Sequence, residues 1–493
     1  MLLIALPGVA ISSYSQTVTP KFLWARNVQE AITRYLPSAP GTCPALSTVS
    51  SIAAGTAGEI YVAGTFWPEN RCEFDVPLTE FLAKFDSAGN ALWFRDTGMR
   101  ITIATDRGGN IYGAGQMYDW MAGSASDVAV KFDSAGNLLW ASPIGEDGRI
   151  AVDALTNVYV SGYFQSPTVL IGNVTLTNAG MGNLFTAKYD ADGNLLWARS
   201  AGGNSYDAAH GVAADATGNV YVTGLFSSTN AVFGAVTLTN LSITEMFVAK
   251  YSPDGNVIWA KSAGGNDEDS SDAIAVDAVG NAYVTGHFFS SNATFGTVTL
   301  TNAGSSLGYP PSDDMFVAKY DPVGNVLWAK SAGGGSRDYG SAIATDAAGN
   351  AYVTGLFCSP SISFGSTTLT NSWNGNLFVA KYNSSGNVQW AKGAGLGSES
   401  VTLAIDQARN VFVAGNFLAT LPLDSVTLTN ANGAQNAFLT KIGFEPPVPN
   451  GDTHQRRNRL HLDRRSRPEL SGSVLRKPSW RELVRPRHPH RGD

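Results

Sequence analysis

The chain of 493 residues contains few cysteines, few histidines and few charged residues. Its three cysteines, Cys43, Cys72 and Cys358, do not have the spacing of metal ligands, and an odd number defines no complete disulfide framework. A Cys43–Cys72 disulfide would suit an exported protein, and isolated buried thiols are the alternative. Charged residues make up 15% of the chain, below the share of about 25% in ordinary soluble domains, while 53 residues are glycine. This composition predicts a β-rich protein with many tight turns.

Long apolar runs are absent too. No stretch approaches the roughly 18 uninterrupted apolar residues of a membrane-spanning helix, so we expect no transmembrane segment. The net charge of −7 argues against nucleic acid as a partner. The hydrophobic share of 44% and the 11 tryptophans are enough for a large core, which excludes disorder as the dominant state.

The first residues differ from the rest of the chain. Residues 1–16 contain an apolar run from Leu2 to Ile11 followed by small residues, which resembles a secretory signal without its basic start. We therefore expect residues 1–17 to be a signal-like segment whose beginning is truncated, and a buried strand is the alternative. A signal implies a secreted, periplasmic or cell-surface protein.

The last residues also differ from the rest of the chain, because they are basic and polar. Residues 446–493 hold 11 Arg and one Lys against five acids, so this tail has a net charge of +7 and residues 1–445 have −14. The tail is rich in Arg, Pro and His and lacks the internal pattern of the preceding chain. We expect it to be disordered or a frameshift product, and a basic arm that binds anionic surfaces is the alternative.

Between these ends the chain repeats itself. One element reads Asp-x-x-Gly-Asn followed by an alternating run, as in AVDAVGNAYVTGHF at 275–288. Seven copies lie at 53–66, 104–117, 151–164, 213–226, 275–288, 344–357 and 404–417. A second element reads FVAKYDxxGNxLWA, with its tryptophan at Trp24, Trp93, Trp140, Trp197, Trp259, Trp328 and Trp390.

Each element predicts a β-hairpin. The Asp side chain accepts hydrogen bonds from N–H groups two or three residues on, and Gly takes the positive φ that closes a type I turn with a bulge. Two hairpins per repeat give four strands, with small residues on the first strand and tryptophan as a large filler on the last. Four-stranded repeats of this length favour a β-propeller over a helical solenoid.

The two ends of the repeat are complementary. The Trp24 strand has no preceding FVAKY strand, and the last such strand, FLTKIG at 438–443, has no tryptophan strand after it. We therefore predict an all-β, seven-bladed propeller over residues 18–445. In it, the N-terminal strand completes the seventh blade and removes an exposed edge.

These motifs resemble the bacterial SBBP-type β-propeller repeats, which read DxxGNxYVTGxF, then FGxxTLTN, then FVAKYDxxGNxLWAKSAGG. The resemblance covers nearly all of 49–442, although residues 67–77 and 117–127 of the first two repeats lack the TLTN segment. Members of this family are mostly predicted exported or surface proteins without an assigned reaction. The resemblance therefore implies the fold and leaves the activity open.

A second likeness is to the tryptophan-docking repeats of quinoprotein-like propellers. The spacings from Asp190 to Gly193 and to Trp197 are each one residue shorter than in that pattern. Similar turn chemistry explains the likeness, and the chain has no recognisable calcium and base constellation for a quinone cofactor.

Few residues suggest chemistry. His210 and His287 are the two histidines of the repeat region, and His287 replaces Leu225 and Leu356 of other repeats, so we interpret it as a packing variant. Asp207, Asp269 and Asp338 share one position, between the last strand of one repeat and the first of the next. His210, Asp272 and Ser341 share a second position.

The acids at the first position allow two interpretations. A semicircle of Asp207, Asp269 and Asp338, with His210 and Asp272 beside it, could form a ligand face that holds a cation such as calcium or the hydroxyl groups of a sugar. The interpretation that we favour is that each Asp caps its own Gly-Gly turn.

We therefore predict a monomeric, non-catalytic scaffold without a resident cofactor, which binds a protein or glycan partner through one face. The variable insertions in the repeats, such as Ser291 to Asp314, favour recognition, because loops on a rigid frame are where binding diverges. The alternative is a carbohydrate-active or quinoprotein-like enzyme.

Overall fold

The computed structural model describes residues 20–33, 46–67, 79–119, 124–304, 312–371, 375–395, 397–430 and 435–444. The signal-like segment, the Cys43–Cys72 pair and the tail 446–493 lie outside these ranges, so the predictions made for them stay predictions. The described residues form seven four-stranded sheets, five two-stranded sheets and the short helix α1 (Val28–Thr33). None of the described helical residues belongs to a helix long and apolar enough to cross a membrane.

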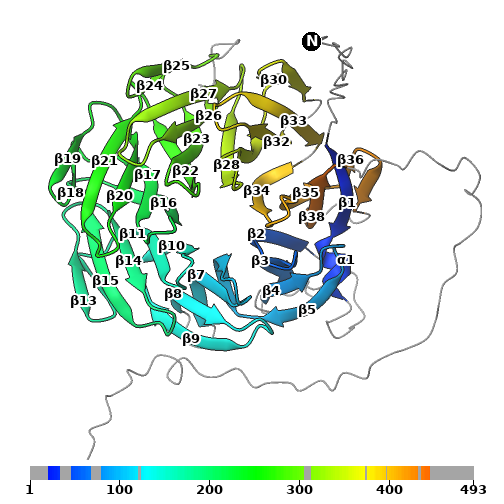
Figure 1. Ribbon diagram of the computed structural model, residues 1–493, viewed down its shortest axis with the longest axis horizontal. Helices are drawn as coiled ribbons and strands as arrows, with labels where there is room; N and C mark the ends of the chain where they lie inside the picture. Colours follow the sequence, from blue (N-terminus) through cyan, green and yellow to red (C-terminus); the bar gives the residue numbers. More distant parts are fainter. Residues whose placement is uncertain are drawn as a thin grey trace, which may run out of the picture.

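The seven four-stranded sheets are antiparallel blades arranged in a ring (Figure 1). In blades 1 to 7 the innermost strands are β2 (Leu46–Ala54), β6 (Met99–Thr105), β10 (Glu146–Val152), β16 (Asp207–Ala214), β22 (Asp269–Val276), β28 (Asp338–Thr345) and β34 (Gly397–Ile405). The second strands are β3 (Ile60–Trp67), β7 (Ile111–Asp119), β11 (Val158–Phe164), β17 (Val220–Phe226), β23 (Ala282–Phe288), β29 (Ala351–Phe357) and β35 (Val411–Leu418).

The outer halves of the blades follow the same order. The third strands are β4 (Thr79–Phe85), β8 (Ser124–Phe132), β14 (Asn183–Tyr189), β20 (Glu245–Tyr251), β26 (Asp314–Tyr320), β32 (Asn376–Tyr382) and β38 (Gln435–Gly443). The outermost strands are β5 (Ala91–Asp96), β9 (Leu138–Pro143), β15 (Leu195–Ala201), β21 (Val257–Ala263), β27 (Val326–Ala332), β33 (Val388–Gly395) and, in blade 7, β1 (Lys21–Asn27).

The ring closes as the sequence predicted. Strand β1 pairs antiparallel with β38, from Lys21 opposite Gly443 to Asn27 opposite Phe438. The N-terminal strand is therefore the outermost strand of the seventh blade, and the blades run from Lys21 to Gly443, within the predicted limits of 18 and 445.

The hydrophobic core lies between neighbouring blades. One cluster joins Tyr283 and Val317 of blade 5 to Val353 and Phe378 of blade 6, all of them buried. Equivalent clusters pack the other blades against each other. Each blade therefore depends on its neighbours for burial, as expected of a repeat architecture.

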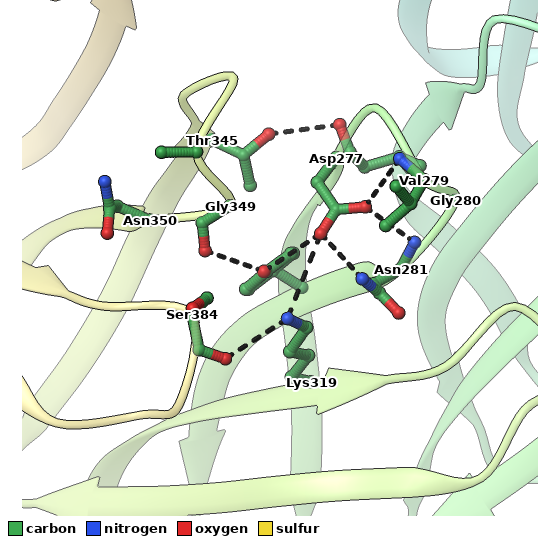
Figure 2. Close-up of polar contacts among 12 residues, drawn as sticks. Asp277, Val279, Gly280, Asn281, Lys319, Thr345, Gly349, Asn350 and Ser384 are labelled. Atoms are coloured by element: carbon green, nitrogen blue, oxygen red, sulfur yellow. Dashed lines mark hydrogen bonds and ion pairs between the residues drawn. The ribbon is translucent and has the colours of Figure 1, made fainter.

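The Asp-x-x-Gly-Asn turns join the first two strands of a blade, as the turn at Asp277 illustrates (Figure 2). Oδ1 of Asp277 accepts hydrogen bonds from the N–H groups of Val279 (3.1 Å) and Asn281 (2.9 Å). Gly280 has a φ of +87° and donates its N–H to the carbonyl of Asp277. The bulged hairpin is confirmed, but the second N–H comes from the fourth residue after Asp, not the third, because the bulge adds a residue.

The same turn also binds the next blade (Figure 2). The Tyr283 hydroxyl lies 3.1 Å from Oδ2 of Asp277 and 2.8 Å from the carbonyl oxygen of Gly349 in blade 6. Nζ of Lys319 donates to the carbonyl of Ser384 in blade 6 (3.2 Å). The repeated Asp and Tyr therefore fix the position of the next blade as well as their own turn.

The insertions between the second and third strands form hairpins at the outside of the ring (Figure 1). In blades 3 to 7 these hairpins are β12 (Thr168–Ile171) with β13 (Val174–Thr177), β18 (Asn230–Phe233) with β19 (Val236–Thr239), β24 (Asn292–Phe295) with β25 (Val298–Thr301), β30 (Ser361–Phe364) with β31 (Thr367–Thr370), and β36 (Thr420–Leu423) with β37 (Val426–Thr429). The N–H of Val232 donates to the carbonyl of Gly202 in the preceding blade (2.9 Å). The described part of the Ser291 to Asp314 insertion thus includes a hairpin at the rim, not a loop over the centre.

Candidate functional site

A cavity of about 1350 Å³ lies where the innermost strands converge. Its wall contains residues from all seven innermost strands, so it is the central channel of the propeller. The charged or titratable residues on the wall, apart from tyrosine, are Arg100, Asp127, Glu146, Asp147, Arg149, His210, Asp272, His287 and Arg337.

β-Bulges place side chains on this wall. The pairing of the first two strands shifts between Ala209 and Gly211, between Ser271 and Ala273, and between Gly340 and Ala342. The extra residues at these bulges are His210, Asp272 and Ser341, and all three line the channel. A bulge residue is left out of the ladder and its side chain is re-aimed. The second equivalent position predicted from the sequence is therefore a bulge position on the channel wall.

The acids at the first predicted position lie elsewhere. Asp207, Asp269 and Asp338 are buried, with at most 1% of their surface exposed, and none of them lines the channel. Oδ2 of Asp207 accepts from the N–H of Gly203 (2.7 Å) and Oδ2 of Asp269 from that of Gly265 (2.8 Å). For these two residues the geometry is that of the local turn cap.

Each of these three carboxylates also binds a serine in the insertion of its own blade. The hydroxyls of Ser228, Ser290 and Ser359 donate to Asp207, Asp269 and Asp338 at 2.6, 2.7 and 2.6 Å. Burial raises the pKa of all three aspartates, and that of Asp338 to about 7. Among the residues that the structure describes, no three His, Cys, Asp or Glu side chains form a group that could hold a metal ion. Calcium binding by these acids was the alternative to the turn cap, and it stays untested.

Two histidines flank Asp272 on the channel wall. Nδ1 of His287 lies 3.0 Å from Oδ2 of Asp272, and Nδ1 of His210 lies 3.8 Å from Oδ1. Burial lowers the pKa of His210, and the charge of Asp272 offsets only part of that effect. Burial acts on His287 in the same direction, but the charge and hydrogen bond of Asp272 outweigh it and raise its pKa. The Asp272 carboxylate thus lies beside His210, in which the neutral form is favoured, and beside His287, in which the charged form is favoured.

The interpretation of His287 as a packing variant is incomplete. Its ring packs at 5.8 Å from the Phe289 ring and 6.4 Å from the Tyr339 ring, but it also pairs with Asp272. In the strand pairing, His287 lies opposite Ser270, and Ser270 is two residues before Asp272. Pairing the two strands of the predicted hairpin would therefore have shown that His287 lies close to Asp272.

A second charged group lies on the channel wall in blades 2 and 3. Nη1 and Nη2 of Arg149 donate to the two carboxylate oxygens of Asp147, at 2.6 and 3.0 Å, and Asp147 has a φ of +52°. Burial, with the charges of Glu146 and Asp147, raises the pKa of Asp127 to about 6. A carboxyl group of this kind can exchange protons near neutral pH.

The closed ring and its channel define the class of this protein, a seven-bladed β-propeller. The family model described as "SBBP: Beta-propeller repeat" matches residues 327–356, from β27 of blade 5 into β29 of blade 6. The seven blades repeat the same motifs along the chain, and in residues 327–356 the chain is similar to the SBBP β-propeller repeat.

Comparison with known proteins adds a distant relative and several fold neighbours. An uncharacterized WD repeat-containing protein of Acanthamoeba polyphaga mimivirus is 30% identical over 184 residues, which are 34% of this chain and 13% of that protein. The chain therefore corresponds to a small part of that relative.

Two solved structures illustrate the neighbours. The polysaccharide lyase Uly1 is similar with a TM-score of 0.44 and 10% identity, over 86% of this chain and 100% of that one. The quinohemoprotein alcohol dehydrogenase of Comamonas testosteroni is similar with a TM-score of 0.39 and 12% identity, over 86% of this chain and 79% of that one. At these scores neither neighbour carries an argument about what this chain does.

Proposed function

We propose that this protein is an exported or cell-surface scaffold that binds a protein or glycan partner at the channel, without a reaction of its own. The observation that carries the proposal is the cavity of about 1350 Å³, onto whose wall successive blades direct their bulge residues. Concave sites on a rigid frame are where folds of this kind place recognition.

The channel wall favours a glycan over a protein. Protein interfaces depend on large apolar and aromatic anchors at their centre. Among the described residues, the large hydrophobic side chains that are exposed, such as Leu196 and Ile258 on the outermost strands, do not line the channel. The wall combines aliphatic residues, such as Ile101 and Ile274, with hydroxyl, imidazole, carboxylate and guanidinium groups, and these polar groups suit a polyhydroxylated ligand.

Closure of the ring supports a monomer. Strand β1 covers the edge of β38 that would otherwise be open to another chain. Export would place the channel in contact with environmental or cell-surface glycans.

A glycan array and a protein pull-down with the full chain test this function. Ser50 lies on the channel wall in blade 1, whereas Ser363 is exposed on a rim hairpin, so Ser50→Trp and Ser363→Trp form a matched pair. We expect the wild type and Ser363→Trp to retain the same partner, and Ser50→Trp to lose it. No retained partner, or equal retention by both variants, would contradict binding in the channel.

The alternative, a carbohydrate-active enzyme, is favoured by Asp127. Its raised pKa and the neighbouring Glu146 are the ingredients of a general acid and base in a concave site. The test is the release of sugar ends from polysaccharides by the wild type and its loss in Asp127→Asn. No observation on the described residues favours a quinoprotein-like enzyme.

A further inference from the structure

Three consecutive bulge residues and one histidine lie together on one side of the channel. They are His210 on β16, Asp272 on β22, Ser341 on β28 and His287 on β23, and we call them the bulge sector. We propose that the bulge sector binds the hydroxyl groups of an uncharged sugar, with His287 as donor, Asp272 as acceptor and Ser341 as a further hydrogen-bonding group. This inference rests on the proposed function and names the ligand class and the residues.

The orientation of His287 leaves a donor for a ligand. Its Nδ1 lies 3.0 Å from Asp272, so Nε2, on the other side of the ring, faces away from that carboxylate. The rings of Phe289 and Tyr339 pack against the imidazole and hold its plane. The raised pKa of His287 favours the imidazolium form, in which Nε2 carries a proton to donate.

Asp272 supplies the matching acceptor. The Ser270 hydroxyl lies 3.3 Å from Oδ1 of Asp272, and Nδ1 of His287 lies 3.0 Å from Oδ2. A carboxylate can accept about four hydrogen bonds, so these contacts leave capacity for another donor. A sugar hydroxyl both donates and accepts, and adjacent donor and acceptor groups fit a pair of neighbouring hydroxyls.

Ser341 gives an independent indication of a ligand. Its Oγ is buried and has no hydrogen-bond partner, although the residue lies on the channel wall. A buried hydroxyl without a partner costs about 1–3 kcal/mol, so such groups normally have one. This Oγ has essentially no surface open to the channel, so a ligand hydroxyl would complete the hydrogen bond only after the Ser341 side chain rotates towards the channel.

The charges of this region indicate an uncharged ligand. The charged groups that interact with His287 are Asp272 on β22, Asp313 before β26, Arg337 before β28 and the buried Asp269 at the start of β22. Nε of Arg337 lies 3.6 Å from Oδ1 of Asp313, so this arginine and the imidazolium each have a carboxylate beside them. Because positive and negative groups are matched, neither an acidic glycan nor a cation would find an excess of opposite charge.

The experiment is calorimetry with the full chain and the neutral oligosaccharide that the glycan array retains best. Asp272→Asn and His287→Gln preserve side-chain size, and Ser363→Ala on the exposed rim hairpin is the control for Ser341→Ala. We expect the first two variants to weaken binding about tenfold or more, Ser341→Ala to weaken it severalfold, and Ser363→Ala to leave it unchanged. Circular dichroism of each variant confirms that it is folded.

Salt and pH separate this proposal from others. Binding of an uncharged sugar is expected to be equal at low and high salt. Because the pKa of His287 is raised, binding should weaken only as the pH rises above the ordinary histidine value of 6.5 and His287 loses its proton, and this pH dependence should be absent in His287→Gln. Full affinity in Asp272→Asn and His287→Gln would overturn the bulge sector and leave the proposed function standing. Retention of only sulfated or uronate-containing glycans would contradict an uncharged ligand. Retention of no glycan by the wild type would contradict both sugar binding by the bulge sector and the glycan partner in the proposed function.

Discussion

The indole Nε1 of Trp259 donates a hydrogen bond to the carbonyl oxygen of Pro322, 3.1 Å away and in the next blade. Trp197 binds Pro253 in the same way at 2.9 Å, and Trp328 binds Ser384 at 3.1 Å. The tryptophan of each repeat was predicted to fill the wide end of its blade. In blades 3, 4 and 5 it also fixes the adjacent blade, with one hydrogen bond and one large apolar contact, whereas Nε1 of Trp390 in blade 6 is buried without a hydrogen-bond partner.

Trp24 makes this contact across the closure of the ring. Its Nε1 donates to the carbonyl of Ser87 in blade 1 (3.2 Å), while its strand β1 belongs to blade 7. We expect Trp24→Ala to lower the free energy of unfolding by about 3–5 kcal/mol, because a large ring and a hydrogen bond are lost together. Guanidinium unfolding followed by circular dichroism measures this change.

Trp259→Ala is the control for closure, since it removes the same contact inside the ring. Only Trp24→Ala is expected to accelerate hydrogen exchange of the β38 amides that pair with β1, because β1 has no covalent neighbour within its blade. Equal exchange in both variants would show that Trp24 has no special role in closing the propeller.

Gly255 lies directly against the ring of Trp197. A Cβ built at this position would come within 2.6 Å of the indole, and the φ of Gly255 is +77°. Gly98 also has a positive φ, +62°, but a Cβ there would have no neighbour within 4 Å. We expect Gly98→Ala to destabilise by about 1–2 kcal/mol from backbone strain, and Gly255→Ala by about 1–3 kcal/mol more. Equal losses in chemical denaturation would contradict a steric role for the glycine.

The fold could be predicted because its signals are local. The alternating strand residues, the Asp-x-x-Gly-Asn turns and the unmatched Trp24 strand define strands, hairpins and closure within short segments. Contacts between blades were not visible in the same way, because Tyr283 and Gly349 lie 66 residues apart. Their pairing depends on how two sheets pack.

The candidate site was predictable in part for the same reason. The repeat aligned His210, Asp272 and Ser341, and the structure places all three on the channel wall. The repeat alone did not show that Asp207 is buried while His210, three residues later, faces the channel. A bulge after Ala209 separates the two positions, and a bulge changes the alternation on which a sequence pattern depends.

Asp277 is predicted to be more important than an ordinary turn residue (Figure 2). Its carboxylate accepts from two N–H groups, from the Asn281 amide and from the Tyr283 hydroxyl. We expect Asp277→Ala to lower the free energy of unfolding by about 3 kcal/mol or more, because several buried donors lose their acceptor. Tyr283→Phe removes only the hydroxyl that reaches Gly349 and should cost about 1 kcal/mol. A larger loss in Tyr283→Phe than in Asp277→Ala, measured by urea unfolding, would contradict this order.

Asp338 should make the protein less stable as the pH rises towards neutrality. Its pKa is about 7 in the folded chain because of burial, with a contribution from the charge of Asp314, and its ordinary value is 3.8. Between these values the folded chain holds a proton that the unfolded chain has released, so the free energy of unfolding falls with increasing pH. Asp338→Asn cannot release this proton, and its amide can still accept from the N–H groups of Cys358 and Ser359 and donate to the Ser359 hydroxyl. We therefore expect a flatter pH dependence in Asp338→Asn, measured by urea unfolding between about pH 4 and pH 7.

The control is Asp321→Asn. Hydrogen bonds within its turn lower the pKa of Asp321, so the contribution of Asp321 to the free energy of unfolding is lost only below about pH 4. Above that pH, the slope of the free energy of unfolding in Asp321→Asn should equal that of the wild type. A wild-type slope in Asp338→Asn would show that Asp338 is ionised in the folded protein.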